Sequence, residues 1–229
     1  MLLAYGDVLL DDPFAFVVLI VAVAVSLLIA ITFHEFAHAF AANRLGDPTA
    51  ARLGRLTLNP KAHLDPTGTI MLLVAGFGWG RPVPVDPRRL WHGRRGMAIV
   101  SAAGPLANVA LALGFALLFQ VGIVTSGGGV FIESLKELDP VAWATVLATY
   151  GVLLNLVLAA FNLLPISPLD GGGILTGVLP SGWLPVVAKL QRYGPFVLIG
   201  VVGLTFFTDV NLLGFVFDPV RDLAVRLMR

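Results

Sequence analysis

Four long runs without a charged residue constrain this chain most strongly. The first, Phe14–Phe33, has twenty residues and as a helix would be about 30 Å long, which matches the hydrocarbon thickness of a bilayer. Similar runs follow at Met97–Val121, Val141–Leu164 and Tyr193–Thr208. Only 13% of the 229 residues are charged, whereas soluble domains carry about 25%. The sequence therefore predicts an all-α polytopic membrane protein.

We expect a single membrane-embedded domain, residues 1–229, with four to five membrane helices. The expected helices lie at about 14–42, 96–121, 141–165 and 193–208, with a further short helix at about 210–227. That last segment would cross the membrane, re-enter it or lie at its surface, since basic residues alternate there with apolar ones. Between the first two helices, residues of about 46–90 contain short apolar pieces interrupted by Gly and Pro. This pattern favours a small β-hairpin or re-entrant region, with strands in Ala50–Leu58 and Thr69–Val85 and a membrane dip at Thr69–Phe77.

The distribution of charge predicts the orientation of the chain in a cell membrane. The segment from Asn43 to Arg95 holds nine of the fifteen basic residues, so the positive-inside rule places it in the cytoplasm. The three acids Asp7, Asp11 and Asp12 precede the first run without any Lys or Arg. We therefore expect the N-terminus outside, no cleaved signal peptide, and the end of the first helix near the cytoplasmic side.

The sharpest chemical signal stands at the end of the first run, in the pattern His34-Glu35-Phe36-Ala37-His38. Residues four apart share one face of a helix, so both imidazoles can reach one ion while Glu35 faces a water on that ion. Ionisable residues in a membrane helix are costly and need a partner, which a metal would supply. The competing interpretation is a helix end at the membrane surface with solvated His and Glu side chains.

A hydrolytic zinc site needs a third protein ligand from elsewhere in the chain. The other histidines are His63 and His92, and His92 lies in an arginine-rich stretch where it is expected to be solvated. Asp170 is the better candidate, because it is the only charged residue between Val141 and Ala188. The competing role for Asp170 is a helix N-cap beside a glycine turn.

Several motifs together resemble the site-2 protease family of intramembrane metalloproteases, peptidase family M50, over most of the chain. They are HExxH at His34–His38, N-P-x-x-H-x-D-P-x-G at Asn59–Gly68, G-W-G-R-P-V-P-V at Gly78–Val85, G-P-L-A-N at Gly104–Asn108, and N-x-x-P-x-x-x-x-D-G at Asn162–Gly171. The first and last are diagnostic as a pair, and the others are similar to compact prokaryotic members. Many members carry PDZ or CBS domains, or a helix ahead of the HExxH helix, and we expect none of these here.

The resemblance implies one zinc ion per chain, bound by His34, His38 and Asp170, with Glu35 as the catalytic base. It implies a membrane-anchored protein as substrate, with the lipid bilayer as surroundings and no nucleic acid as partner. It gives no indication of the oligomeric state. The alternatives are a membrane metal transporter, which would need ligands along a path across the bilayer, and a non-catalytic scaffold derived from a protease.

Four further polar residues are candidates for supporting roles. Asn162 would donate to the scissile carbonyl or oxyanion, or else pack between helices. His63 and Asp65 would support the ligands or shape the loop, and a structural turn between two prolines is an equal alternative. Asn108 is a further candidate for support of the ligands, with a hydrogen bond between helices as the favoured role.

Overall fold

The structure is a computed structural model that describes residues 12–68, 80–125, 135, 139–207 and 214–229. The long helices of this part are α2 (Pro13–Arg44), α5 (Arg94–Gln120), α7 (Pro140–Asn162) and α9 (Leu184–Phe207). The shorter helices are α3 (Thr49–Arg52), η1 (Pro60–Ala62), α8 (Asp170–Val178), η2 (Ser181–Trp183) and α10 (Gly214–Leu227). Among the described residues, three helices are long and apolar enough to cross a membrane, namely α2, α5 and α7. The prediction of a helical multi-pass membrane protein is confirmed at that level.

Local sequence signals explain where the first and third of these helices begin. Asp12 accepts hydrogen bonds from two backbone N–H groups in the first turn of α2, both at 3.0 Å, and Pro13 occupies the first helical position. Asp139 and Pro140 repeat this arrangement at the start of α7. A capping carboxylate followed by proline satisfies free N–H groups and sets the backbone angle that a helix needs.

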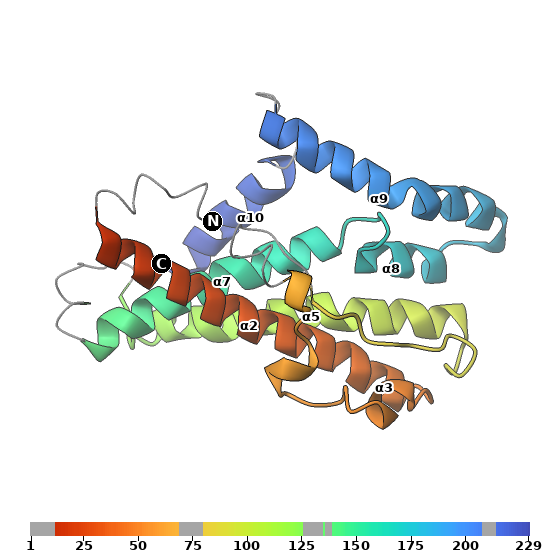
Figure 1. Ribbon diagram of the computed structural model, residues 1–229, viewed down its shortest axis with the longest axis horizontal. Coiled ribbons are helices and arrows are strands. Elements are labelled where there is room, and N and C mark those ends of the chain that lie inside the picture. The colour runs from red at the N-terminus through yellow and green to blue at the C-terminus, as the bar shows by residue number, and fades with distance from the viewer. Residues whose placement is uncertain (1–11, 69–79, 126–134, 136–138, 208–213) are drawn as a thin grey trace.

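Helix α5 is the central element of the arrangement. It contacts α2, α7 and α8, while α10 contacts α7 and α9 contacts α8. In Figure 1, α2, α5 and α7 run side by side, and α9 lies apart from α2 and α5 on the side of α8. Side chains of α5 therefore lie between the other helices, where they can support a site built from several of them.

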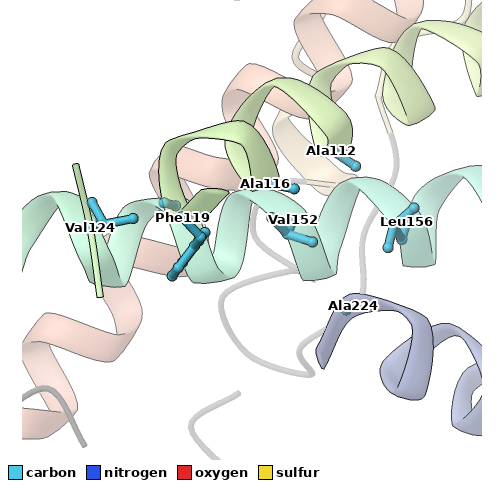
Figure 2. Packing of buried hydrophobic residues seen from close by; sticks show 8 residues of the cluster. Ala112, Ala116, Phe119, Val124, Val152, Leu156 and Ala224 are labelled. Carbon is cyan, nitrogen blue, oxygen red and sulfur yellow. The ribbon is translucent and has the colours of Figure 1, made fainter. Parts of the chain in front are cut away.

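Small residues allow α5 and α7 to approach closely. Their shared core contains Ala112, Ala116 and Phe119 of α5, Val152 and Leu156 of α7, and Ala224 of α10 (Figure 2). Gly151 of α7 lies against the ring of Phe115, where an added Cβ would be 2.6 Å from the ring carbons. Close approach through small residues is the usual way in which membrane helices pack.

The C-terminal helices leave the number of crossings open. The expected fourth helix, residues 193–208, corresponds to α9, which begins already at Leu184 and is described as far as Phe207. Helix α10 has 14 residues, and at about 1.5 Å per residue it is shorter than the hydrocarbon core. It exposes Phe215 and buries Ala224, so only one of its faces is covered by protein. Four to five crossings, and a single domain, remain predictions.

The prediction of a strand at Ala50–Leu58 is wrong. Its first residues belong to α3, and turns connect α3 to η1. The physical reason lies at Asp47, whose carboxylate accepts hydrogen bonds from the N–H and hydroxyl groups of Thr49 and so starts a helical turn. That turn buries Ala50 where α3 contacts α2.

The described part of the region between α2 and α5 contains no strand. It holds one isolated antiparallel bridge, between Leu64 and Gly80, and the residues after Gly80 continue without regular structure. The expected re-entrant stretch, Thr69–Phe77, lies outside the described residues. In the described residues, the bridge between Leu64 and Gly80 is thus what remains of the expected hairpin.

Candidate metal centre

Two imidazole rings of α2 meet next to α5. His34 and His38 are four residues apart in the helix, so their side chains lie on one face, one turn apart. Both residues are buried, and their Nε2 atoms are 3.0 Å from each other. The rings are nearly perpendicular, with centroids 4.6 Å apart. Two ring nitrogens at this separation can bind the same cation.

Asp170 brings a carboxylate to the same point from the start of α8. Its Oδ2 lies 3.1 Å from Nε2 of His34, and its Oδ1 lies 3.3 Å from Nε2 of His38. Asp170 is not a helix cap, because the N-cap position of α8 is Leu169 and no side chain caps that end. Oδ2 is buried, and no hydrogen bond of normal geometry from the described residues reaches it.

His34, His38 and Asp170 form a group, within the part of the chain that the structure describes, whose ligand atoms all lie within 4.8 Å of one another. Two imidazoles and one carboxylate are a ligand set of hydrolytic zinc sites, in which the fourth position stays open. A buried carboxylate oxygen without a donor is costly unless a cation compensates it. The residues present therefore fit a divalent metal ion.

The hydrogen bonds behind the rings fix which nitrogen atoms face this centre. Nδ1 of His38 lies 2.7 Å from the carbonyl oxygen of Val100, which only accepts, so Nδ1 carries the proton and donates. Nδ1 of His34 lies 2.6 Å from Oδ1 of Asn108 and donates in the same way. Metal-binding histidines ordinarily donate their second ring N–H to an oxygen, which leaves the other nitrogen available to the metal.

Gly104 of α5 makes room for the two rings. A Cβ at this position would lie 2.4 Å from Nε2 of His38 and 2.7 Å from Nε2 of His34. Real Cβ contacts are not this short, so any larger residue would displace at least one ring. The G-P-L-A-N motif therefore begins with glycine because the two imidazole rings occupy the space that a side chain would need.

Glycines of α8 place Asp170 by allowing close contact with α5. A Cβ on Gly173 would lie 2.2 Å from Oγ of Ser101, and a Cβ on Gly177 would lie 2.4 Å from Cβ of Ala98. These glycines are four residues apart and line one face of α8. The carboxylate thus reaches the histidines because the backbones of the two helices approach each other.

Glu35 faces the extended segment that follows the isolated bridge. Its Oε2 accepts a hydrogen bond from the backbone N–H of Val83 at 3.1 Å. Gly80 lies near the other oxygen, since a Cβ there would be 3.7 Å from Oε1 of Glu35. The segment Gly80–Val85 therefore borders the carboxylate that follows His34 in the sequence.

Asp47 ties this segment to the end of α2. It is completely buried, and its Oδ2 accepts a hydrogen bond from the N–H of Asp86 at 2.7 Å. Burial raises the pKa of the Asp47 carboxyl group, but hydrogen bonds from Thr49 and Asp86 outweigh burial and lower the pKa below its usual value. An ionised Asp47 thus holds the chain just beyond Val85 in place.

Three predicted supporting residues form hydrogen bonds with partners other than the three candidate ligands. Asn162 ends α7 and donates to the carbonyl oxygen of Leu158 at 2.9 Å, so its role towards a substrate stays a prediction. His63 is completely buried, with Nε2 bonded to the carbonyl oxygen of Thr57 at 2.8 Å. Asp65 accepts from the N–H of Gly68 at 2.8 Å. The side chains of His63 and Asp65 thus each form a hydrogen bond within their own loop.

The sequence motifs did not point to Asn155 of α7, although it contacts Asn108 directly behind His34. Its Oδ1 accepts a hydrogen bond from Nδ2 of Asn108 at 2.9 Å. The available signal was its position, because a carboxamide in the middle of an uncharged membrane helix is unfavourable unless it has partners.

Comparison with known proteins finds relatives along most of the chain. "Putative zinc metalloprotease YwhC" of Bacillus subtilis (strain 168) is 43% identical over 179 residues, which cover 76% of this chain and 77% of that protein. "Putative zinc metalloprotease Rip2" of Mycobacterium tuberculosis (strain ATCC 25618 / H37Rv) is 34% identical over 215 residues, which cover 91% and 75%. Rip2 of Mycolicibacterium smegmatis is 32% identical over 197 residues, which cover 84% and 70%. No solved structure gives a significant match.

The sequence profile of Peptidase family M50 matches residues 22–186. This range includes both histidines of α2 and the aspartate of α8, and it covers α2 from residue 22 onwards and the whole of α5, α7 and α8. The resemblance inferred from the motifs is thereby confirmed at the level of the family. The chain belongs to peptidase family M50.

Proposed function

We propose that this chain is a zinc metalloprotease that hydrolyses peptide bonds of membrane-anchored proteins. One zinc ion per chain would be bound by His34, His38 and Asp170. The observation that carries the proposal is that α2 and α8 bring these three ligand atoms together, all within 4.8 Å of one another. Membership of family M50 and the names of the relatives support the same activity.

Glu35 is the general base in this proposal. Zinc, when bound, would polarise the scissile carbonyl and make a water molecule more acidic. Glu35 would take a proton from that water and deliver it to the leaving amine. The N–H of Val83 holds Oε2 of this carboxylate in place, so Oε1 is the atom expected to carry the proton.

The substrate would bind in an extended form along Gly80–Val85. A membrane helix hides its peptide bonds in its own hydrogen bonds, so it has to unwind before cleavage. The N–H of Arg81 donates to the carbonyl of His63 at 2.7 Å, and that of Val83 donates to Glu35. Pro82 and Pro84 have no N–H to offer. This segment therefore pairs with a substrate mainly by accepting hydrogen bonds from substrate N–H groups.

The proposed orientation has the N-terminus outside and the metal centre near the cytoplasmic side of the cell membrane. In this arrangement α9 makes a fourth crossing, and α10 lies at the interface or completes a fifth. The chain has no cysteine, so single cysteines can report orientation. A cysteine at Leu58, which is 49% exposed, should react with a membrane-impermeant maleimide in inside-out vesicles. Reaction in intact cells instead would reverse the orientation.

The activity is tested by co-expression with a panel of tagged single-span membrane proteins, followed by metal analysis of the purified chain. We expect one zinc per chain and a shortened form of at least one panel member. Glu35→Gln should retain zinc and lose cleavage, because the amide cannot accept the proton. Asp222→Asn, at a carboxylate that is 62% exposed, is the matched control and should cleave normally. Normal cleavage by the Glu35→Gln variant would contradict the assignment of the base.

A further inference from the structure

A chain of buried carboxamides leads from α7 to His34. Asn155 of α7 and Asn108 of α5 are both completely buried. Nδ2 of Asn155 donates to the carbonyl oxygen of Gly151 at 2.8 Å, and its Oδ1 accepts from Nδ2 of Asn108 at 2.9 Å. Oδ1 of Asn108 in turn accepts from Nδ1 of His34 at 2.6 Å. The contacts thus connect three helices in a line that ends at a candidate metal ligand.

The carbonyl group of Gly151, at the α7 end of this chain of contacts, fixes the direction of each hydrogen bond that follows. The carbonyl of Gly151 only accepts, so Asn155 must turn its NH2 group towards it and its oxygen towards Asn108. Nδ2 of Asn108 then donates both of its hydrogens, one to Asn155 and one to the carbonyl oxygen of Ala30 at 3.1 Å. Only Oδ1 of Asn108 remains for His34, and it can only accept. Nδ1 of His34 must therefore carry the proton.

The second histidine does not depend on side chains in this way. Nδ1 of His38 donates to the backbone carbonyl of Val100, which cannot rotate. Without Asn155, one hydrogen bond, from Nδ2 of Asn108 to the carbonyl oxygen of Ala30, would oppose a turn of the carboxamide that brings its NH2 group to the ring and favours the wrong tautomer. With Asn155 in place, that rotation would put two donors or two acceptors face to face in a buried site, which is strongly unfavourable.

We infer that Asn155 is a positioning residue for the metal centre, acting through Asn108 to keep His34 protonated at Nδ1 and to present its Nε2 to the metal. This inference rests on the proposed function, because it assumes that His34 binds a metal ion. It assigns a role in the centre to a residue of α7, the helix that provides none of the three candidate ligands. It also explains why a carboxamide occupies a completely buried position of an apolar helix.

The test measures zinc affinity by competition with a chromophoric chelator, and the visible absorption spectrum of the cobalt-substituted protein. Asn155→Leu has a similar volume but cannot accept from Asn108. We expect its zinc affinity to fall about tenfold, at the lower end of the range for partners of metal-binding histidines. The cobalt bands should shift or weaken as well, because the ligand field reports the geometry of His34.

Two further variants separate positioning from packing. Asn155→Asp keeps an oxygen for Asn108, and burial favours the neutral acid, whose O–H can still donate to Gly151. We expect it to restore both zinc affinity and the cobalt spectrum. Thr145→Val removes a buried hydroxyl of the same helix, which donates to the carbonyl oxygen of Val141 at 2.7 Å. We expect this control to match the wild type.

The outcomes are distinguishable. Wild-type zinc affinity and an unchanged cobalt spectrum in Asn155→Leu would overturn the inference and leave the proposed function intact. Equal losses in the Leu and Asp variants, or a comparable loss in Thr145→Val, would assign the effect to packing and also overturn it. If the leucine variant does not fold, Asn155→Ala replaces it with the same expectations. Absence of zinc binding by the wild type would remove the proposed function itself.

Discussion

Helices α5 and α9 are of similar length, yet their surroundings differ. Helix α5 packs against α2, α7 and α8 and buries Gly104 and Asn108 directly beside the histidines. Helix α9 contacts α8 and leaves large apolar side chains such as Phe196 and Ile199 exposed, at 72% and 69%. Contacts with other helices therefore restrict which side chains α5 can carry. Most of α9 only needs apolar side chains that are compatible with lipid. Changes at the helix contacts of α5 should affect the metal centre, and changes on the exposed face of α9 should not.

The difference comes from how closely backbones approach. Where α5 meets α2, α7 and α8, a glycine of one helix lies against a side chain of the other. A Cβ built on Gly104, Gly151 or Gly173 would lie 2.4, 2.6 or 2.2 Å from the nearest heavy atom, so added atoms have no space there. Along α9, Gly194 makes a contact of this kind, since a Cβ built there would lie 2.4 Å from the backbone oxygen of Ser167. Further along the same helix, Gly200 and Gly203 have no heavy atom within 4 Å of a built Cβ. Tight contacts determine the position of side chains to a few tenths of an ångström, which a metal site needs. Loose contacts leave the side chains more freedom than a metal site tolerates.

The largest effect is expected for Gly104→Ala. The new Cβ would meet both imidazole rings, so we expect zinc affinity to fall by about 100-fold and proteolysis to disappear. Gly114→Ala is the matched control on the same helix, since no heavy atom lies within 4 Å of a Cβ built there. Zinc affinity is measured by chelator competition, and proteolysis by a cleavage assay, for both variants. Normal zinc binding by Gly104→Ala would show that the rings have more freedom than the distances indicate.

A smaller loss is expected for Gly173→Ala, which acts on the carboxylate rather than the imidazoles. The added Cβ would lie 2.2 Å from Oγ of Ser101 and push α8 away from α5. We expect zinc affinity to fall about tenfold. The double variant Gly173→Ala/Ser101→Gly removes the clashing side chain and should recover most of this affinity. Failure of the double variant to recover would mean that Asp170 is placed by something other than this contact.

Gln191→Leu tests how far α9 contributes to the centre. Gln191 donates to the carbonyl oxygen of Gly172 at 3.0 Å and also bonds the hydroxyl of Thr176, so it joins α9 to α8. We expect the free energy of unfolding to fall by about 1 kcal/mol, the usual value of a neutral hydrogen bond. Zinc affinity should change by less than about threefold, since α5 already fixes α8. A tenfold loss would make α9 part of the support of Asp170.

The smallest effect is expected for Ile199→Ala on the exposed face of α9. Its side chain contributes little to packing, so the free energy of unfolding in detergent should change by less than about 0.5 kcal/mol. Val152→Ala in α7, where the residue is completely buried, is the comparison and should lose about 1–2 kcal/mol through the cavity it leaves. Equal losses would indicate that another element or a second chain covers α9.

The sequence predicted the parts of the structure that depend on neighbours along the chain. The i, i+4 spacing of His34 and His38 places both on one helix face wherever that helix lies. The uncharged runs predicted α2, α5 and α7 because hydropathy over twenty residues depends little on tertiary contacts. The strand expected at Ala50–Leu58 failed for a local reason as well. The carboxylate of Asp47 starts a helical turn there that alternating hydrophobicity does not reveal.

The sequence by itself therefore determined the membrane helices, the pair of imidazoles and the chemical nature of a third ligand. Only the tertiary structure decided that Asp170 meets both rings, that Gly104 makes room for them, and that Asn155 stands behind His34 through Asn108. These facts depend on distances between helices that are far apart in the chain. Such distances follow from the packing of small residues against each other, and no periodicity or spacing along one segment contains them.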